Sequence, residues 1–268
     1  MENVQELLQL MARLRDPLHG CPWDLRQDFK SLAPYCLEEA QEVVDAIERG
    51  DSDHLREELG DLLLQVVFLA RIAEEQGLFD FAAVVETLKA KLTRRHPHVF
   101  GERRFASEAA FKAFWEDTKT EEQKARHPGG KKGLLDGIAR TLPALSRAQK
   151  IQSKAARVGF DWPSVAPVYA KLEEELEELR DAAGHGNRDH TEEEMGDVLF
   201  VIANLARHYG LDAETALRKG NDKFLRRFAD LETQVAASGR RFEDHSLDEL
   251  DLYWAKAKDH ESQTAKET

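Results

Sequence analysis

Two pairs of acidic residues in the second half of this sequence are spaced in a way that suits metal binding. Glu175 and Glu178 are three positions apart, and Glu194 and Asp197 repeat that spacing. Residues three apart lie on one face of a helix, so each pair would present its two carboxylates together. Oxygen ligands without His or Cys suit Mg²⁺ or Mn²⁺ and do not suit zinc. The four acids are therefore candidate ligands of such a cation.

The same acidic pattern occurs twice, because residues 38–71 align with residues 174–207 at a constant offset of 136, with 16 identities in 34 ungapped positions. The first copy supplies the matching acids Glu39, Glu42, Glu58 and Asp61. Acids near a helix start can take part in capping, but in the first copy Leu55 stands where the second has Thr191, and leucine cannot cap. Capping alone therefore does not explain the acids.

A turn containing Gly50 in the first copy, or Gly186 in the second, separates the two acidic pairs. The two helices should therefore run antiparallel and bring four carboxylates together. The segments 62–70 and 198–206, "LLLQVVFLA" and "VLFVIANLA", are apolar all round. This pattern predicts that the second helix of each pair is buried and carries its acids at the edge of a core. Four carboxylates there would repel one another unless a cation joined them.

Acids at this spacing also occur on solvated helix faces and in di-iron bundles. A single Glu-x-x-Glu pair most often decorates a solvated helix face. A di-iron bundle is the nearest metal alternative, but it needs Glu-x-x-His on two helices, and here Glu or Asp holds the fourth position. Repetition of the whole pattern beside an apolar helix favours the Mg²⁺ or Mn²⁺ site.

The composition bounds the class of protein. The chain has 268 residues, 41% hydrophobic and 33% charged, which is enough for the cores of two domains. Its formal charge of −13 argues against a nucleic-acid polymer or an anionic membrane as partner, whereas divalent cations could bridge a nucleotide to it. No apolar run of about 18 residues occurs, and the first ten residues lack a signal-peptide pattern. We expect a cytoplasmic protein in which Cys21 and Cys36 are reduced.

Helical periodicity runs through almost the whole chain, and no alternating strand pattern appears. The sequence predicts an all-α fold of two tandem helical-bundle domains, 1–125 and 143–268, related by the internal duplication. Residues 126–142 are the expected linker, since "RHPGGKKG" combines Pro, Gly and Lys without an apolar residue. Helices are expected near 4–14, 32–49, 52–76, 80–95, 107–125, 143–157, 165–183, 189–209, 212–237 and 246–259.

Several motifs, taken in order, carry a family resemblance. Besides the duplicated "EExxE" and "EExGD", the chain contains "DPLHGCPWD", "RRHPHVF", "LPAL", "AQKIQ", "VGFDW" and "KFLRRF". In this order they resemble the tandem two-domain members of the MazG family of nucleoside triphosphate pyrophosphohydrolases, in the all-α NTP pyrophosphatase superfamily. The resemblance implies Mg²⁺-dependent hydrolysis of NTPs and dNTPs to the monophosphate and pyrophosphate, by a homodimer. It also implies a catalytic second domain, a mainly structural first domain, and the ligands Glu175, Glu178, Glu194 and Asp197.

Other residues of the second half suit a triphosphate substrate. Glu174 or Glu193, each beside a ligand, could orient or deprotonate the attacking water. Three basic residues about one helical turn apart could neutralise phosphate oxygens, unless they form a solvated basic stripe. They are Lys223, Arg226 and Arg227.

Trp254 and Lys258, at positions i and i+4, could supply a stacking face for the base and a further phosphate contact, although a lone Trp is more often a core residue. A Trp face reads no hydrogen-bond edges, so the range of bases should be broad. The alternative function is a Mg²⁺-nucleotide-binding scaffold or sensor that acts through partners without turnover. Retention of the complete acidic quartet favours the enzyme.

The first half keeps matching pieces, so it could form a second metal and nucleotide site. They are Glu39, Glu42, Glu58, Asp61, Arg94, Arg95, Trp115 and Lys119. His96 and His98 flank Pro97 in this half and are expected to be a structural pair, because no Cys or further His stands at ligand spacing.

Overall fold

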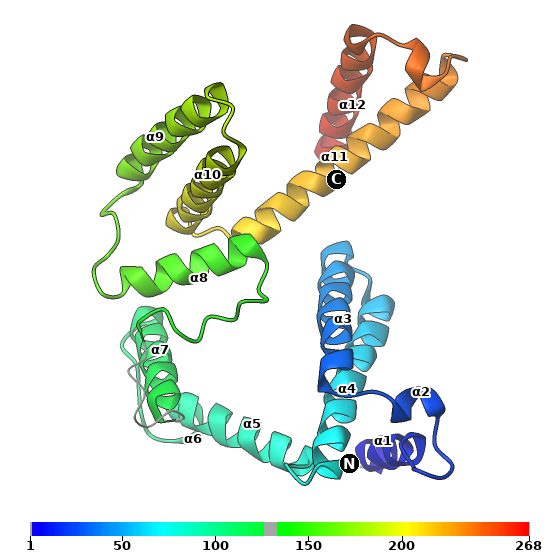
Figure 1. Cartoon of the computed structure of the whole chain (residues 1–268), viewed down its shortest axis with the longest axis vertical. Coiled ribbons are helices and arrows are strands. Elements are labelled where there is room, and N and C mark those ends of the chain that lie inside the picture. Colours follow the sequence, from blue (N-terminus) through cyan, green and yellow to red (C-terminus); the bar gives the residue numbers. More distant parts are fainter. Residues whose placement is uncertain (1, 126–132, 268) are drawn as a thin grey trace. The chain divides into compact units, whose positions relative to one another are not determined.

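The computed structural model describes residues 2–125 and 133–267, most of which are helical (Figure 1). No strand occurs in those ranges, which confirms the predicted all-α fold. The chain divides into two compact units, Met1–Arg126 and His127–Thr268. Residues 126–132 of the expected linker lie outside the described residues. None of the described helices is long and apolar enough to span a membrane.

The first unit is built around two long neighbouring helices. Its elements are α1 (Glu2–Leu14), α2 (Pro22–Leu25), α3 (Phe29–Arg49), α4 (Ser52–Glu75), α5 (Phe81–Arg95), α6 (Pro97–Phe100) and α7 (Glu108–Ala125). Helices α3 and α4 lie side by side, and α1 packs against α4. Helix α3 begins earlier than predicted because Asp28 and Ser31 form a reciprocal capping box at its start. Helices α2 and α6 are too short to leave a periodic signal in the sequence.

The second unit repeats this plan. Its elements are α8 (Ala144–Ala156), α9 (Val165–Gly184), α10 (Arg188–His208), α11 (Ala213–Ala237), the 3₁₀ turn η1 (Phe242–Asp244) and α12 (Leu247–Glu267). Helices α9 and α10 form the antiparallel pair, α8 packs across α10, and α11 pairs with α12. Helix α12 continues past the predicted end near residue 259.

The same turn joins both long helix pairs. Gly50 and Gly186 adopt φ values of 71° and 68°, which residues with a Cβ rarely do. The next residue caps the following helix in each copy, since Asp51 accepts a hydrogen bond from the backbone N–H of His54 and Asn187 accepts one from His190. These turns fix the register in which the two acidic pairs face each other.

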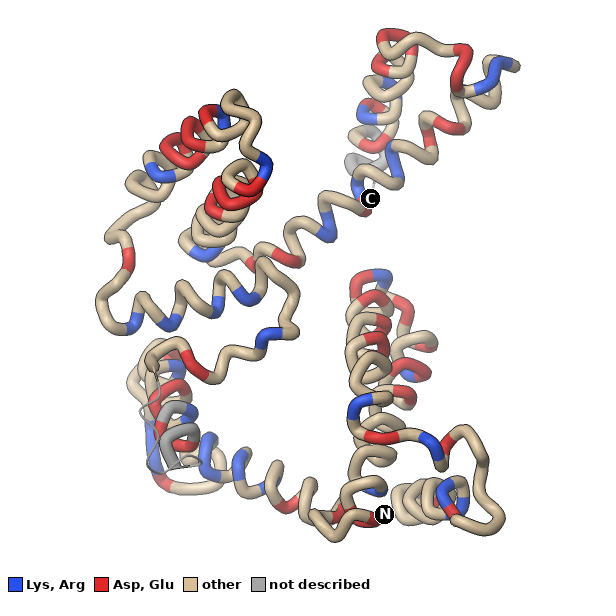
Figure 2. The backbone as a smooth tube through the Cα atoms, viewed as in Figure 1, with Lys and Arg blue, Asp and Glu red and all other residues tan. Residues whose placement is uncertain are grey.

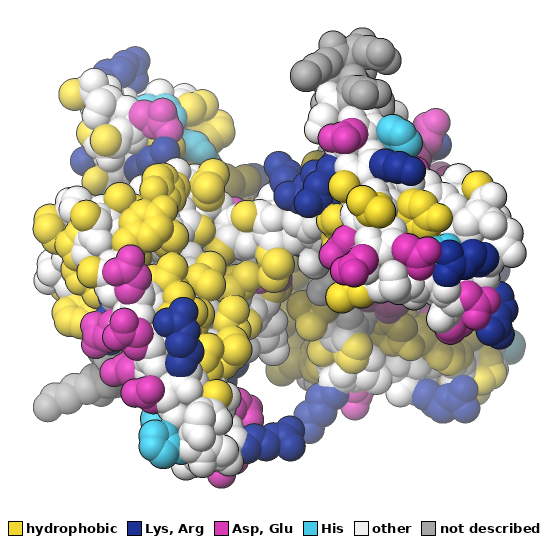
Figure 3. Space-filling view, turned by 90° about the horizontal axis from the view of Figure 1, so that it is seen from above, with side chains coloured by type: hydrophobic (Ala, Val, Ile, Leu, Met, Phe, Trp, Pro, Cys, Tyr) yellow, Lys and Arg dark blue, Asp and Glu magenta, His cyan; other side chains and the backbone are white. Residues whose placement is uncertain are grey.

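The apolar helices α4 and α10 are only partly buried within their own units. Met11, Leu32, Val67, Phe68 and Ile72 form the core of the first unit. The second helix of each pair is only partly buried within one chain, because the helices packed against α4 and α10 leave part of each surface uncovered. The side chains left open are 39% to 50% exposed, namely Leu59, Leu63 and Val66 on α4 and Met195, Leu199, Phe200 and Ile202 on α10. Figure 3 shows hydrophobic side chains over much of the face that it presents.

Candidate metal centres

The second copy places its four acids on two facing helices. Glu175 and Glu178 lie on α9, and Glu194 and Asp197 lie on α10. Figure 2 shows acidic residues along both helices of this pair. Glu175 and Glu194 are only 5% and 9% exposed, whereas the other two are open to solvent. Carboxylate oxygens of Glu175, Glu194 and Asp197 lie within 4.8 Å of one another. Three of the four sequence-predicted ligands therefore converge, and Glu178 stands beside them with a pKa raised by desolvation and by the charge of Glu175.

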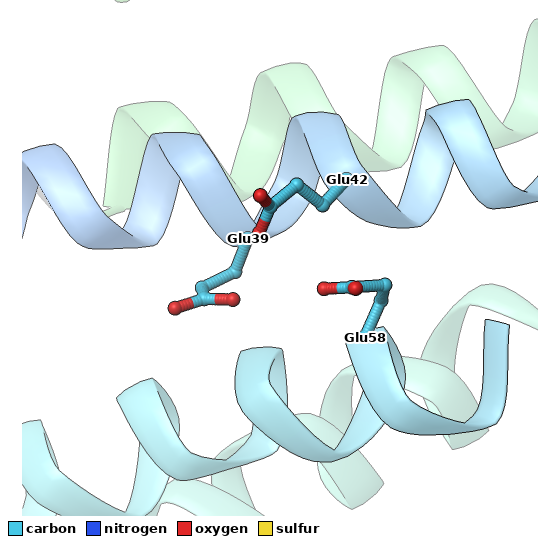
Figure 4. A group of neighbouring side chains, drawn as sticks. All are labelled: Glu39, Glu42 and Glu58. Carbon is cyan, nitrogen blue, oxygen red and sulfur yellow. The ribbon is translucent and has the colours of Figure 1, made fainter. Parts of the chain in front are cut away.

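The first copy gathers a corresponding cluster. Glu39 and Glu42 on α3 point towards Glu58 on α4, and their carboxylate oxygens lie within 4.8 Å of one another (Figure 4). Asp61 does not join that group. Burial raises the pKa of Glu39, and the charge of Asp61 raises it further. Burial also raises the pKa of Glu58, with Glu42 as the next cause. A cation among these carboxylates would favour their ionised forms and so offset both causes.

The donor set of both clusters fits a hard divalent cation. In the described ranges each cluster offers carboxylate oxygens and neither includes a His or Cys ligand atom. Such oxygens at short mutual distances are the ligands of Mg²⁺ and Mn²⁺. The arrangement can hold one of these ions between two helices.

A lysine that sequence reasoning missed lies against the second cluster. Nζ of Lys171 is 2.7 Å from Oε1 of Glu174 and 2.7 Å from Oε1 of Glu175. Hydrogen bonds to Glu174 and then to Glu175 raise the pKa of Lys171. The i+3 and i+4 spacing on one helix was the available signal. The first copy has Tyr35 at the equivalent position, so its cluster has no such cation.

A histidine contact occurs in both copies and was also missed. Nδ1 of His54 is 3.3 Å from Oε1 of Glu58, and Nδ1 of His190 is 3.3 Å from Oε1 of Glu194. Each pair has i, i+4 spacing on the second helix. Glu193, a candidate for handling the attacking water, is exposed and has a carboxylate oxygen 3.9 Å from Nδ1 of His190.

The predicted phosphate-binding residues lie on a different helix pair of the second unit. Figure 1 shows α11 running away from α9 and α10, with α12 returning along it. Within one chain the structure does not bring these side chains to the carboxylate cluster. Arg226 and Arg227 pair instead with Glu261 at 3.0 and 2.6 Å. Trp254 is half-buried, with its ring centre 5.1 Å from that of Phe224. The other two predicted phosphate-binding residues, Lys223 and Lys258, are exposed.

The first unit repeats this basic and aromatic arrangement on α5 and α7. Arg94 and Arg95 both pair with Glu122, which lowers the pKa of Glu122 to about 2. The Arg95 guanidinium also lies 5.3 Å from the ring centre of Trp115. Lys119 pairs with Glu116 at 3.0 Å. The two histidines of "RRHPHVF" pack on aromatic rings, His96 at 4.9 Å from Trp115 and His98 at 4.7 Å from Phe111.

Comparison with known proteins agrees with this geometry. Residues 27–100 and 164–231 match the MazG nucleotide pyrophosphohydrolase domain, once in each half. The nucleoside triphosphate pyrophosphohydrolase of Escherichia coli K12 is 49% identical over 265 residues, which cover 97% of this chain and 99% of that protein. The nucleoside triphosphate pyrophosphohydrolase/pyrophosphatase MazG of Thermotoga maritima is 44% identical over 254 residues, 95% of each chain.

A solved structure, that of a mazG-related protein from Thermotoga maritima, is 26% identical, covers 43% of this chain and 98% of its own, and has a TM-score of 0.37. The domain match covers more than half of the residues, and the relatives above are similar along almost the whole length. This chain therefore belongs to the MazG family.

Proposed function

We propose that this chain hydrolyses nucleoside triphosphates to the nucleoside monophosphate and pyrophosphate, with Mg²⁺, at the carboxylate cluster of its second copy. The observation that carries the proposal is the convergence of Glu175, Glu194 and Asp197 within 4.8 Å, two of them almost fully buried. Relatives similar over nearly the whole chain are named nucleoside triphosphate pyrophosphohydrolases, which supports the same reaction here.

The acidic quartet of α9 and α10 is the proposed metal-binding set. Glu175 and Glu194 are buried at the helix interface, whereas Glu178 and Asp197 are exposed and have room to adjust to an incoming ion. Mg²⁺ bound there would polarise the phosphoryl group and lower the pKa of the attacking water. Mn²⁺ has the same ligand preference and should substitute for it.

The attacking water needs a group that orients it and accepts its proton. Glu174 and Glu193 remain the candidates for that role. Glu193 is exposed, and Glu174 is bound by the Lys171 ammonium at 2.7 Å. Glu193 is therefore the better candidate, because the carboxylate of Glu174 is already engaged by the Lys171 ammonium. Lys171 acts as a positioning residue that holds the carboxylates of Glu174 and Glu175 and balances part of their charge.

Binding of the triphosphate would use the basic and aromatic side chains of α11 and α12. Phosphate oxygens would compete with Glu261 for Arg226 and Arg227, and the exposed ammonium groups of Lys223 and Lys258 lie on the same helix pair. Trp254 offers a stacking face without base-specific hydrogen bonds, which predicts a broad base range.

A homodimer would bring these two groups of side chains together. Within one chain α11 leads away from the carboxylates, and an apolar strip of α10 stays open next to them. A second chain that covers this strip could place its own α11 and α12 beside the cluster. The first copy would then serve mainly as structure.

Pyrophosphate release tests the proposal. Purified chain is incubated with ATP, and separately with other NTPs and dNTPs, in Mg²⁺ and in EDTA. We expect equal amounts of monophosphate and pyrophosphate in Mg²⁺ and neither product in EDTA. Release of inorganic phosphate and nucleoside diphosphate would contradict the reaction, and Mg²⁺-dependent nucleotide binding without any product would favour the scaffold or sensor.

A further inference from the structure

The turn between α10 and α11, residues 209–212, joins the helix that carries two acids of the cluster to the helix that carries the predicted phosphate-binding residues. We call this turn the elbow. It closes α10 with a C-terminal cap, in which Gly210 has a φ of 69° and the backbone N–H of Leu211 donates to the carbonyl oxygen of Ala206 at 2.9 Å. The direction in which α11 leaves α10 therefore depends on how the elbow is held.

The side chain of Gln149 on α8 holds both sides of the elbow. Its Nε2 donates to the carbonyl oxygens of Ala203 at 3.2 Å and of Leu211 at 2.9 Å, and its Oε1 accepts from the backbone N–H of Ala213 at 3.1 Å. Ala213 is the first residue of α11, and the first N–H groups of a helix have no partner within that helix. One amide therefore ties α10, the elbow and the start of α11 together through its donors and its acceptor.

The core around this amide is small. It consists of alanines from three helices, Ala148, Ala203 and Ala213, with Leu145 and Ala206 packed against them. Methyl groups bury little apolar area, and apolar contacts have no preferred direction, whereas hydrogen bonds are directional. The hydrogen bonds of Gln149 are therefore the contacts that can set the angle between α10 and α11.

Apolar contacts hold the matching turn of the first unit, residues 76–80 between α4 and α5. Gly77 there has a φ of 67°, close to that of Gly210. Leu8 and Phe81, from α1 and the start of α5, pack against the core that contains Met11. A cavity with a volume of about 340 Å³ opens between α1, α4 and the start of α5. Among the described residues, the amide bridge is therefore a feature of the copy to which we assign turnover.

A small change at the elbow would have a large effect at the predicted phosphate-binding residues. Arg227 lies 14 residues after Ala213 (227 − 213). That is about 21 Å along a helix that rises 1.5 Å per residue, so a rotation of about 10° at the elbow would move the Arg227 backbone by about 4 Å, more than the length of a hydrogen bond. Trp254 and Lys258 on α12 would move as well, because α12 packs against α11.

We propose that Gln149 is a positioning residue that sets the direction of α11 and α12, and with it the place at which their basic and aromatic side chains meet the triphosphate. It acts through these helices and does not touch the substrate. The inference rests on the proposed function, since that assigns triphosphate binding to α11 and α12, but the direction of the helices can be measured without nucleotide.

Distances between spin labels test the direction of α11 in the full chain. Labels are attached through Asp189→Cys on α10 and Glu232→Cys on α11, both exposed positions, after Cys21→Ser and Cys36→Ser. Excess unlabelled chain is added so that a dimer carries labels on one chain only. Pulsed electron paramagnetic resonance should give a narrow distance distribution when Gln149 is present. Gln149→Met matches the length of glutamine without its three hydrogen bonds, and should broaden or shift the distribution.

Gln152 on the same helix provides the matched control. Its Nε2 donates to the carbonyl oxygen of Phe200 at 2.7 Å, which joins α8 to α10 and does not involve α11. Gln152→Met should therefore leave the label distances unchanged. An unchanged distribution in Gln149→Met, or the same broadening in both variants, would overturn the proposal.

Steady-state kinetics test the consequence for the substrate. Gln149→Met should raise the KM for ATP about tenfold or more, which corresponds to the loss of one hydrogen bond to a charged group. Its kcat should fall less than about threefold, because the metal ligands remain in place and only uniform binding is lost. Gln149→Glu keeps the acceptor for Ala213 but cannot donate to the two carbonyl oxygens, so it should behave alike, and it serves if the methionine variant melts early.

Gln152→Met should keep the wild-type KM. An unchanged KM in both folded Gln149 variants, or an equal rise in Gln152→Met, would show that Gln149 only supports packing. A wild-type chain without turnover would contradict the proposed function, and the label distances would still decide whether Gln149 sets the direction of α11.

Discussion

The two copies share their acids and differ in the groups beside them. Each has a buried glutamate on the second helix with a histidine 3.3 Å away. The second copy adds an internal cation, Lys171, that binds Glu175 and Glu174. The first copy has Tyr35 at that position and a buried amide, Gln65, where the second has Val201.

This difference shows how one duplicated helix pair can serve two purposes. Carboxylates that are partly balanced by an ammonium can remain metal-free, and can receive a metal together with an anionic substrate. Carboxylates without such a partner repel one another until a cation arrives. We therefore propose that residues next to the acidic quartets, rather than the quartets themselves, decide which copy turns over nucleotide.

Removal of one metal ligand should separate the copies most clearly. Glu175→Gln or Asp197→Asn should lower pyrophosphate release about a thousandfold, because metal polarisation contributes several kcal/mol and each 1.36 kcal/mol is tenfold in rate. The matched changes Glu39→Gln and Asp61→Asn should lower it less than about threefold. Initial rates with ATP and saturating Mg²⁺ measure both.

Circular dichroism and sedimentation serve as controls for folding and assembly of these variants. Folded first-copy variants that are inactive, beside active second-copy variants, would mean that the catalytic copy is the first one.

The fold was largely predictable from the sequence because the determining interactions are local. Helix ends follow caps and turn glycines, such as Asp51 and Gly50, that are close in the sequence. The convergence of three acids in each copy also followed from i, i+3 spacing and an antiparallel return. The all-round apolar pattern of α4 and α10 predicts more apolar surface than a helix hairpin covers, but it does not say whether the covering surface belongs to the same chain.

The side-chain partners of the site were harder to predict. The arginines of "KFLRRF" were expected to face phosphate, and the structure pairs them with Glu261, about a helix hairpin away in the sequence. Along the sequence Gln65 is one polar residue in an apolar helix, and only the three-dimensional structure places it against Glu39. Partners separated along the chain leave no periodic signal.

Assembly of the chain should depend on the exposed apolar side chains of α4 and α10, which form one open strip on each helix. We expect a homodimer at micromolar concentration, and Leu199→Glu should raise its dissociation constant by at least about a hundredfold. A buried leucine contributes about 1.5–3 kcal/mol and occurs twice in a dimer. Leu63→Glu makes the same change in the first copy, and we expect a similar loss there. Sedimentation equilibrium measures both, and a compact wild-type monomer would show that no second chain covers these strips.

The ion pairs of Glu122 with Arg94 and Arg95 should contribute more to the free energy of unfolding than those of Glu261 with Arg226 and Arg227. The side chain of Glu122 is 11% exposed and that of Glu261 is 29% exposed. Glu122→Gln should lower the free energy of unfolding by about 1.5–3 kcal/mol, as expected for the loss of partly buried hydrogen bonds between charged groups. Glu261→Gln should lower the free energy of unfolding by less than about 1 kcal/mol. It should also lower the KM for ATP, because it frees Arg226 and Arg227 for phosphate. Urea unfolding and steady-state kinetics measure these effects, and a raised KM would contradict the phosphate-binding role.

The smallest expected effect is a pH dependence of stability in the metal-free first copy. Burial and neighbouring acids raise the pKa of Glu39 and Glu58 above their unfolded values. Each group then binds its proton more readily when folded, so in EDTA the chain should gain stability as pH falls through the raised pKa values towards the unfolded value of 4.5, and lose it as pH rises. Acids with lowered pKa, such as Glu122 at about 2, act oppositely but only below their unfolded value of 4.5. Within the higher window the raised acids therefore determine the slope.

Thermal melts across that window test the pH dependence with a matched pair of variants. Glu58→Gln removes one raised acid and should flatten the slope. Glu57→Gln removes an exposed acid from the adjacent position of the same helix and should leave the slope unchanged. Saturating Mn²⁺ should reverse the slope in wild type, because a bound cation requires ionised carboxylates and loses affinity when they are protonated. Equal slopes for Glu58→Gln and Glu57→Gln in EDTA would mean that the first cluster behaves as an ordinary solvated face.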